Sequence, residues 1–360
     1  KLSGVWIMAY TTIDNPELFF QTVLWTGNGS SSRSITLDGS VDMQPDWTWL
    51  KARAGSEGTQ QHYLYDSVRG ATKYLQSSTT NAEGTKSNGL SAFASDGFTI
   101  GDDNANNGSS TTYVAWNWKA GNSSGSSNSD GSISSTVSVN TTAGFSIVSY
   151  TGTGSATTVG HGLGVAPKLI IVKRRDSSAN WFVGSDSLGW TKYLYLDLTE
   201  AAETNAGAWN NTSPTSSVFS IGTFGNVNAS SGTYIAYCFS EKKGYSKIGT
   251  YTGNGNADGT FVYTGFAPAF VLSKCTSHTG ENWNINDNKR PGSNVIQNAL
   301  LPDSNAAEVT ASFQALDILS NGFKWRGTND RVNASGKSYL YMAFAESPFV
   351  NANRIPNNAR

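Results

Sequence analysis

The sequence predicts an all-β protein built from three tandem antiparallel β-sandwich domains with jelly-roll-like strand spacing, and three observations support this. A proline-led apolar strand that ends on a lysine occurs three times, as MQPDWTWLK (43–51), VAPKLIIVK (165–173) and FAPAFVLSK (266–274). Apolar residues alternate at period two in the first of these strands, which favours a half-buried strand over a helix. The 360-residue chain also contains 38 Gly, 15 Tyr and 16 Phe, a composition that suits short strands joined by tight turns.

The repeats set the expected domain boundaries. Their prolines lie about 100 to 120 residues apart, which is the size of a domain and too long for a solenoid repeat. The sequence therefore predicts a first domain at 1–121, a Ser/Gly/Asn-rich linker at 122–140, a second domain at 141–243, a third domain at 244–347 and a C-terminal tail at 348–360.

Local patterns define the elements of the first domain. The apolar stretch 4–10 is far shorter than the about 20 residues that span a bilayer, so it is expected to be a strand. The other main strands are expected within 46–53, 62–70, 71–76, 96–101 and 111–121.

Two polar segments interrupt the strand patterns. GDDNANNG (101–108) is expected to be an exposed hairpin tip; its oxygen-rich side chains suit Ca²⁺, but it lacks the spacing of a known calcium loop. The segment 122–140 is nearly free of apolar residues until Val137. It buries too little apolar surface to offset its ordering entropy, so it is expected to be a flexible linker.

The second and third domains repeat the plan of the first. Three further landmarks recur: a strand that ends in Asp, with Asn-Trp at its start in the last two domains, a Gly-Phe turn, and a last strand led by a tyrosine. These landmarks lie at Asp66; Asn180, Trp181 and Asp186; Asn282, Trp283 and Asp287; Gly97 and Phe98; Gly322 and Phe323; and Tyr113, Tyr234 and Tyr339.

The charge balance argues against several partners. The chain has 25 basic and 26 acidic residues, a net charge of −1, and no stretch in which lysine and arginine concentrate. A nucleic-acid partner and an anionic membrane surface both require such a concentration, so neither is expected. The two cysteines, Cys238 and Cys275, lie in different domains and are expected to be free.

No catalytic, metal or cofactor site is predicted. The three histidines, His62, His161 and His278, fall at unrelated points of the three domains, and none has the spacing of a metal ligand. The Asp-x-x-Arg pairs Asp66–Arg69 and Asp287–Arg290 are expected to be turn-stabilising or local ion pairs.

The carboxylates leave one alternative open. In the second domain, the counterpart of the Asp-x-x-Arg pairs is expected at Asp186 and Gly189, where the arginine is missing. Glu83, Glu203 and Glu308 follow the middle strands and are placed to pair with those aspartates as in a glycosidase.

Tryptophans in the recurring strands are expected in the cores. Trp190, Trp209 and Trp325 stand beside polar loops outside the landmarks, so these rings are expected to be exposed and to bind a carbohydrate or another receptor. The alternative is that they fill gaps between domains or protomers.

Several long segments carry a resemblance to a known group of proteins. DNPELFFQTVLWTGNGSS, MQPDWTWLKAR, LYDSVRGATKYLQSS, SNGLSAFASDGFTIG, TTYVAWNWKAG and GFSIVSYTGTGSATTVGHGLGVAPKLIIVKRRD resemble uncharacterised repeat domains in structural proteins of marine tailed bacteriophages. The resemblance covers nearly the whole chain. It carries over no catalytic or binding residue, because none is defined for the group.

The resemblance implies a virion structural protein, made in the host cytoplasm. A tail fibre or appendage that contacts a host cell-surface receptor without catalysis is the leading expectation, with polysaccharide as one receptor class. A capsid decoration or fibre-shaft protein and a polysaccharide-degrading tailspike enzyme are the alternatives. Phage appendages of this type are generally closed assemblies, so a homotrimer that contacts other virion proteins is expected.

Overall fold

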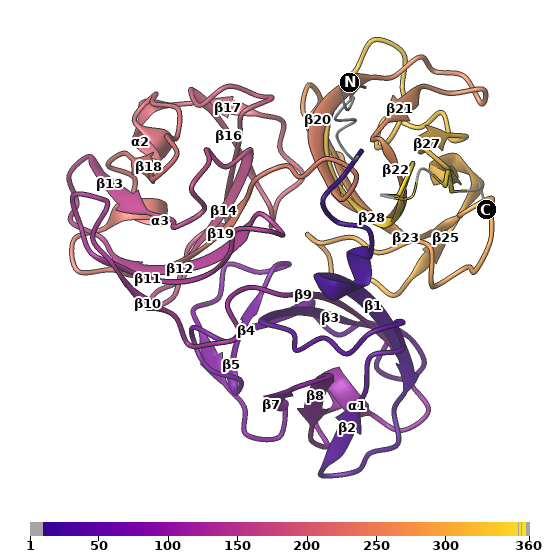
Figure 1. Cartoon of the computed structure of the whole chain (residues 1–360), viewed down its shortest axis with the longest axis horizontal. Helices are drawn as coiled ribbons and strands as arrows, with labels where there is room; N and C mark the ends of the chain where they lie inside the picture. The colour runs from indigo at the N-terminus through magenta and orange to yellow at the C-terminus, as the bar shows by residue number, and fades with distance from the viewer. Residues whose placement is uncertain (1–9, 352, 354, 358–360) are drawn as a thin grey trace, which may run out of the picture.

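The computed structural model describes residues 10–351, 353 and 355–357, and Figure 1 shows three lobes arranged around one centre. The predicted antiparallel all-β class is confirmed, with 42% of residues in strands and 5% in helices. Over the described part of the chain, no helix is both long and apolar enough to cross a membrane. The expected strand at 4–10 lies outside the described residues except for Tyr10.

Each lobe is organised around one large sheet. The lobes are called the first, second and third units, and they contain β1 to β9, β10 to β19 and β20 to β28 in that order. In sheet order, the first has β1 (Phe20–Thr26), β9 (Thr112–Trp118), β3 (Trp47–Ala54), β4 (Tyr63–Asp66), β5 (Lys73–Gln76) and β6 (Gly84–Thr85). The second has β10 (Ser126–Asn128), β11 (Ser135–Asn140), β12 (Phe145–Thr151), β19 (Thr233–Phe239), β14 (Leu169–Arg174), β15 (Phe182–Ser185), β16 (Lys192–Tyr195) and β17 (Glu203–Thr204). The third has β20 (Ser246–Thr252), β28 (Ser338–Pro348), β22 (Phe266–Cys275) and β23 (Asn284–Asp287).

A smaller sheet packs on one face of each large sheet. These sheets are β2 (Arg33–Ile35), β8 (Gly97–Ile100) and β7 (Leu90–Ala94); β13 (Thr157–Gly160) and β18 (Val218–Ile221); and β21 (Phe261–Tyr263), β27 (Gly322–Trp325) and β26 (Leu316–Leu319). The remaining elements are the pair β24 (Asn298–Ala299) and β25 (Val309–Thr310) and the short helices η1 (Pro16–Leu18), α1 (Asn104–Asn107), α2 (Ala206–Trp209), α3 (Gly225–Asn228) and η2 (Ser312–Gln314).

Alternate residues along the strands of the large sheets lie in two different cores. In β3, Leu50 faces the small sheet of its own unit, whereas Trp49 faces the centre of the molecule. Each unit thus has a core of its own, and one further cluster contains buried residues from all three units. The large sheets are therefore apolar on both faces.

Aromatic rings from different units meet in the shared central core. Trp47 of the first unit stacks on Tyr237 of the second, with ring centroids 4.4 Å apart. Phe344 of the third unit lies 5.4 Å from Phe20 and 5.9 Å from Phe239. Because burying large rings is a major source of stability, the three units hold one another in place as parts of one body.

The segment expected to be a flexible linker is instead part of the second unit. Residues 135–140 form β11, which pairs along its whole length with β12, and β10 pairs with β11 in turn. Val137 is buried in the core of that unit. The expectation failed because a strand that joins an existing sheet edge gains backbone hydrogen bonds and needs few apolar side chains of its own.

The recurring Thr-Gly-x-Gly turns have a steric cause. A Cβ atom on Gly27, Gly152 or Gly253 would lie 2.1, 2.5 or 2.3 Å from the carbonyl oxygen of Gly108, Ala229 or Ala334, respectively. Only glycine permits this approach between the turn after β1, β12 or β20 and the loop before the last strand of the same unit.

Candidate functional site

The three tryptophans predicted to be exposed are buried, so that expectation is wrong. Trp190 is 5% exposed, and Trp209 and Trp325 are 0% exposed. The rings of Trp190 and Trp209 meet edge to face at 5.6 Å, and both approach within 2.6 Å of the position that a Cβ on Gly184 would occupy. The register places Gly184 where the first unit has Tyr65, so the two indoles fill the volume that this glycine leaves.

The structure assigns structural roles to two histidines. His62 is buried and accepts a hydrogen bond from Trp49 Nε1 at 2.9 Å, and burial lowers its pKa well below the ordinary value. His161 accepts from the backbone amide of Leu163 at 3.1 Å, and burial lowers its pKa as well.

His278 lies in a more exposed group. Within the described residues, one set of side chains, His278, Glu281 and Asp330, brings its possible ligand atoms within 4.8 Å of one another. The His278 and Asp330 side chains are 42% and 45% exposed, and their closest contact is 3.7 Å. This is the geometry of a surface ion pair, and we place no metal there.

The expected hairpin tip at 101–108 contains the helical turn α1. Its N-cap residue, Asp103, accepts a hydrogen bond from the amide of Ala105, and Asn106 and Asn107 are buried. The Asn107 side chain accepts from the amide of Asn28 at 3.1 Å, which ties this turn to the first Thr-Gly-x-Gly turn. The amide side chains therefore brace the loop from inside.

The predicted Asp-x-x-Arg ion pairs are confirmed, and they are buried. The side chains of Asp287 and Arg290 are 0% exposed, with Arg290 Nε 2.6 Å from Asp287 Oδ2. The amide of Arg290 also donates to Asp287, and Nη2 donates to the carbonyl of Ile285 at 2.8 Å. Arg69 makes the same contacts with Asp66 and with the carbonyl of Leu64.

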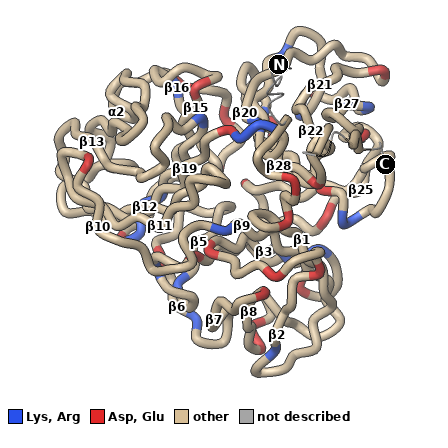
Figure 2. Tube along the Cα trace, in the orientation of Figure 1, with Lys and Arg blue, Asp and Glu red and all other residues tan. Residues whose placement is uncertain are grey.

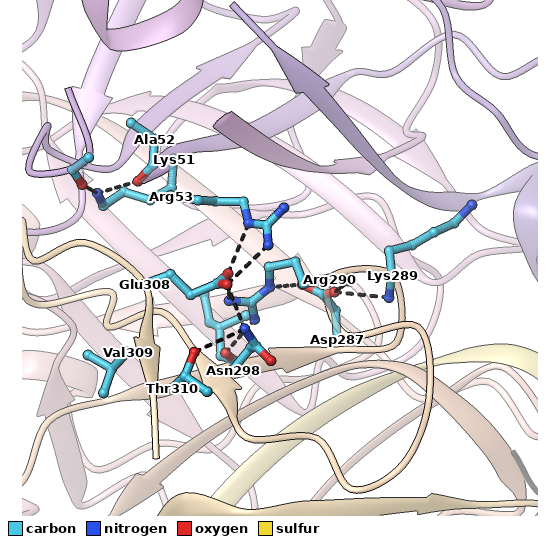
Figure 3. A network of polar contacts seen from close by, with 12 residues as sticks. Lys51, Ala52, Arg53, Asp287, Lys289, Arg290, Asn298, Glu308, Val309 and Thr310 are labelled. Carbon is cyan, nitrogen blue, oxygen red and sulfur yellow. Dashed lines mark hydrogen bonds and ion pairs between the residues drawn. The ribbon is translucent and has the colours of Figure 1, made fainter. Parts of the chain in front are cut away.

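A glutamate extends each pair to a neighbouring unit, and Figure 3 shows this for the pair of Asp287 and Arg290. Glu308 of the third unit accepts from Arg290 at 2.9 Å and from two nitrogens of Arg53 in the first unit, each at 3.0 Å. Burial alone would raise the pKa of Glu308, but its hydrogen bonds with Arg53 and the charge of Arg290 hold that pKa at about 2. Glu83 in turn pairs with Arg175 of the second unit at 2.8 Å and with Arg69 at 3.4 Å.

An aromatic donor completes each network. Trp116 Nε1 donates to Oδ2 of Asp287 at 2.9 Å, and Tyr237 Oη donates to Oδ2 of Asp66 at 2.7 Å. Two of the three junctions between units therefore contain the same kind of network. Each has an aromatic donor, an aspartate, an arginine that pairs with it, a glutamate and a second arginine that binds the glutamate across the junction. The networks consist of Tyr237, Asp66, Arg69, Glu83 and Arg175, and of Trp116, Asp287, Arg290, Glu308 and Arg53.

Among the described residues, the junction between the second and third units lacks this network. Ser185 pairs with Leu169 as Asp66 pairs with Trp47, so the counterpart of Asp66 is Ser185 and not Asp186 as the sequence suggested. Asp186 instead pairs with Lys168, and both side chains are over 40% exposed. By the same register, the five positions at this junction are Met342, Ser185, Leu188, Ala202 and Thr276.

One backbone contact persists at all three junctions. The amide of Glu83 donates to the carbonyl of Arg175 at 2.8 Å, and the amide of Glu308 donates to the carbonyl of Arg53 at 2.8 Å. The third junction keeps this bond, from Ala202 to Thr276 at 2.9 Å. The backbone arrangement is thus shared, whereas the polar side chains are present at two junctions only.

One protein family matches the part of the sequence that contains all three junctions. The sequence matches the family described as a domain of unknown function, DUF7483, over residues 15–348. The chain belongs to this family. No curated protein and no solved structure matches the chain.

The apolar junction of this DUF7483 chain borders a cleft. It has a volume of about 440 Å³, and Leu188 and Thr276 of the junction line it together with Lys192, Thr250 and Ser338.

The recurring lysines are a further feature of the DUF7483 fold. Lys51, Lys173 and Lys274 are all 0% exposed, and each ammonium donates to backbone carbonyl groups, such as those of Gly58, Ala179 and Glu281. Burial lowers the pKa of Lys51 to about 7 and those of Lys173 and Lys274 to about 8. Each lysine therefore anchors the loop that follows its strand.

Two aspartates with raised pKa values were not singled out from the sequence. Burial raises the pKa of Asp197 to about 6 and that of Asp303 to about 7. Asn180 donates to Asp197 at 2.9 Å, and Asn282 donates to Asp303 at 3.1 Å. The signal was present in the Asn-Trp landmark, because its asparagine is followed by an aspartate 17 residues later in the second unit and 21 residues later in the third.

The arrangement of the glutamates does not suit a glycosidase. A general acid needs a carboxyl group that is protonated near neutral pH, whereas Glu308 has a lowered pKa and is bridged by two arginines. Glu203 accepts a hydrogen bond from Tyr193 at 2.5 Å and lies in neither network. Glu83 and Glu308 instead join neighbouring units through their arginine partners.

Proposed function

We propose that this chain is a non-catalytic structural protein of a phage virion, part of a tail fibre or tail appendage that contacts the host cell surface. One observation carries the non-catalytic role: the most concentrated charged groups, Asp66 with Arg69 and Asp287 with Arg290, are 0% exposed and joined across units. The resemblance of the sequence segments to phage structural proteins supports the virion context.

The joining of the units supports a structural role that depends on rigidity. Domains in one chain move relative to one another unless their interface is large and apolar. Here the three units share an aromatic core, and glutamate–arginine bridges reinforce two of the junctions. A rigid body of this kind suits an appendage that must keep a binding surface in a fixed orientation.

The charge distribution is consistent with protein and cell-surface partners. Figure 2 shows that most of the trace is uncharged and that acidic and basic segments lie close together where the lobes meet. The net charge of −1 does not favour a nucleic acid. The proposed partners are other virion proteins and a host receptor, and the proposed assembly is a homotrimer, whose mass by light scattering would be three times the 38.3 kDa of one chain.

Antibody labelling of intact virions in negative stain tests the location. The proposal predicts label on the tail or its fibres, and label confined to the head would replace it with a capsid-decoration role. Incubation with host surface polysaccharide tests the chemistry. No new reducing ends are expected, and their appearance would identify a tailspike enzyme.

A further inference from the structure

Two large aromatic side chains project from the outer small sheet of the third unit. Phe261 and Tyr263 are 44% and 54% exposed, whereas Val262 between them is 6% exposed. The two rings lie on the same face of β21, which is an edge strand of its sheet. Exposed rings side by side are costly in water unless they serve a contact.

The equivalent strands of the other units have no such rings. Val262 pairs with Phe323 as Ile35 pairs with Phe98 and as Val159 pairs with Phe219. Around these inward residues the first unit has Ser34 and Thr36, and the second has Thr158 and Gly160. The fold therefore does not require aromatic side chains at these positions, and their presence in the third unit calls for another reason.

Tyr263 also lines a cleft of about 500 Å³. Tyr10 lines the same cleft, with its hydroxyl 3.3 Å from that of Tyr263 and donating to the carbonyl of Gly265 at 2.8 Å. The ammonium of Lys243 lies 4.5 Å from the centre of the Tyr10 ring. Glu241 and Lys247, which pair at 3.1 Å, complete the charged lining.

We propose that this cleft binds a saccharide of the host surface, an inference that rests on the attachment role proposed above. The apolar C–H face of a sugar ring would lie on Tyr263, and Phe261 would extend the platform along the strand to the next ring. Lys243 and Glu241 are placed to donate to and accept from sugar hydroxyl groups. A pocket with an aromatic wall and a few polar groups is typical of small-ligand sites.

The size of the feature favours a saccharide over a protein. A stable protein partner buries about 800 Å² on each side. Two exposed rings and the residues that line the cleft of about 500 Å³ are fewer than the about 20 to 30 residues that each side of such an interface contributes, and they suit one or two sugar rings. The occupant is therefore assigned as a short stretch of polysaccharide.

The site is tested by substitutions that give Phe261 and Tyr263 the side chains found at the equivalent positions of the first unit. Tyr263→Thr copies Thr36 of the first unit, and Phe261→Ser copies Ser34, so both are compatible with the fold. Phe313→Ser is the matched control, because Phe313 is a 41% exposed ring elsewhere on the third unit. Each full-length protein is applied to an array of immobilised neutral and uronic-acid-containing oligosaccharides, and its thermal midpoint is measured.

The wild-type protein and Phe313→Ser are expected to bind the same oligosaccharides, with binding reduced about tenfold or more in Tyr263→Thr and Phe261→Ser at unchanged thermal midpoints. Equal binding by all four proteins, or no oligosaccharide bound by the wild type, would overturn the site. Adsorption of the same proteins to host cells separates the two proposals. If the wild type and all variants adsorb equally, the attachment role stands and the site falls; if the wild type does not adsorb but binds the array through Tyr263, the site stands and the attachment role falls.

Discussion

The hydroxyl of Tyr237 in the second unit donates a 2.7 Å hydrogen bond to the carboxylate of Asp66 in the first unit. Trp116 of the first unit occupies the equivalent position and donates to Asp287 of the third unit at 2.9 Å. In the third unit, Met342 stands at this position, and the counterpart of Asp66 at the same junction is Ser185. The presence or absence of one donor thus coincides with the presence or absence of a whole ion network.

Removal of one arginine from a network is expected to be strongly destabilising. Arg69→Leu leaves the buried Asp66 carboxylate without its cation, which costs about 3 to 5 kcal/mol. Urea unfolding of the wild type and of Arg69→Leu measures the loss of unfolding free energy. Arg174→Leu is the control, because Arg174 pairs with Asp176 at the surface and such pairs contribute about 0 to 1 kcal/mol. Similar losses in both variants would show that the buried network is not special.

Replacement of a complete network is expected to cost less than replacement of one member. A five-residue variant gives the junction between the first and second units the side chains found at the junction between the second and third units. It leaves no unpaired charge. Buried ion pairs replaced as a whole by apolar side chains are often neutral or stabilising. The variant combines Asp66→Ser, Arg69→Leu, Glu83→Ala, Arg175→Thr and Tyr237→Met.

The free energy of unfolding of the five-residue variant, measured by urea unfolding, is expected to exceed that of Arg69→Leu alone. If the five-residue variant is the less stable of the two, the junctions are not interchangeable in the way that the register indicates.

The buried lysines predict that stability rises with pH above neutrality. In the folded chain, Lys51 loses its proton near pH 7 and Lys173 and Lys274 near pH 8, whereas unfolded lysines keep theirs up to about pH 10.4. The unfolded state binds more protons between these values, so the unfolding free energy increases with pH. Urea unfolding at pH 7.5 and 8.5 measures this slope.

The slope is expected to be smaller in Lys51→Met than in the wild type, and unchanged in the control Lys192→Met, because Lys192 is exposed. An identical slope in Lys51→Met would mean that Lys51 stays charged in the folded chain.

Trp209 is expected to behave as a core residue. Its ring is 0% exposed and contacts Trp190 edge to face. Trp209→Ala is expected to lose about 3 to 5 kcal/mol of unfolding free energy through the cavity that it leaves. Thermal unfolding and adsorption to host cells are measured together: a fall in the thermal midpoint is predicted, whereas lost adsorption at an unchanged midpoint would return Trp209 to a binding role.

The fold class was predictable because its signals are local. Period-two alternation, turn glycines and the proline before each repeated strand act within a few residues, and a strand is present in each of the five segments 46–53, 62–70, 71–76, 96–101 and 111–121. The buried Asp-x-x-Arg pairs were predictable for the same reason, because both members lie within one turn.

The residues whose positions were predicted wrongly from the sequence owe those positions to contacts with residues distant in the sequence. Trp190 and Trp209 are buried because Gly184 leaves room for them in a neighbouring strand, which no local pattern reveals. The segment 122–140 is ordered by the edge of β12, and Ser185 replaces Asp186 as the counterpart of Asp66 only once the strand register is known. Phe261 and Tyr263 could have been found by aligning the three repeats with one another at the strand before each proline.

Differential scanning calorimetry tests most directly the central claim that the three units form one rigid body. The shared aromatic core and the networks at two junctions predict a single unfolding transition, with a calorimetric enthalpy equal to the van't Hoff enthalpy. Two or three separable transitions, each with the enthalpy of one unit, would contradict it and return the units to independent domains.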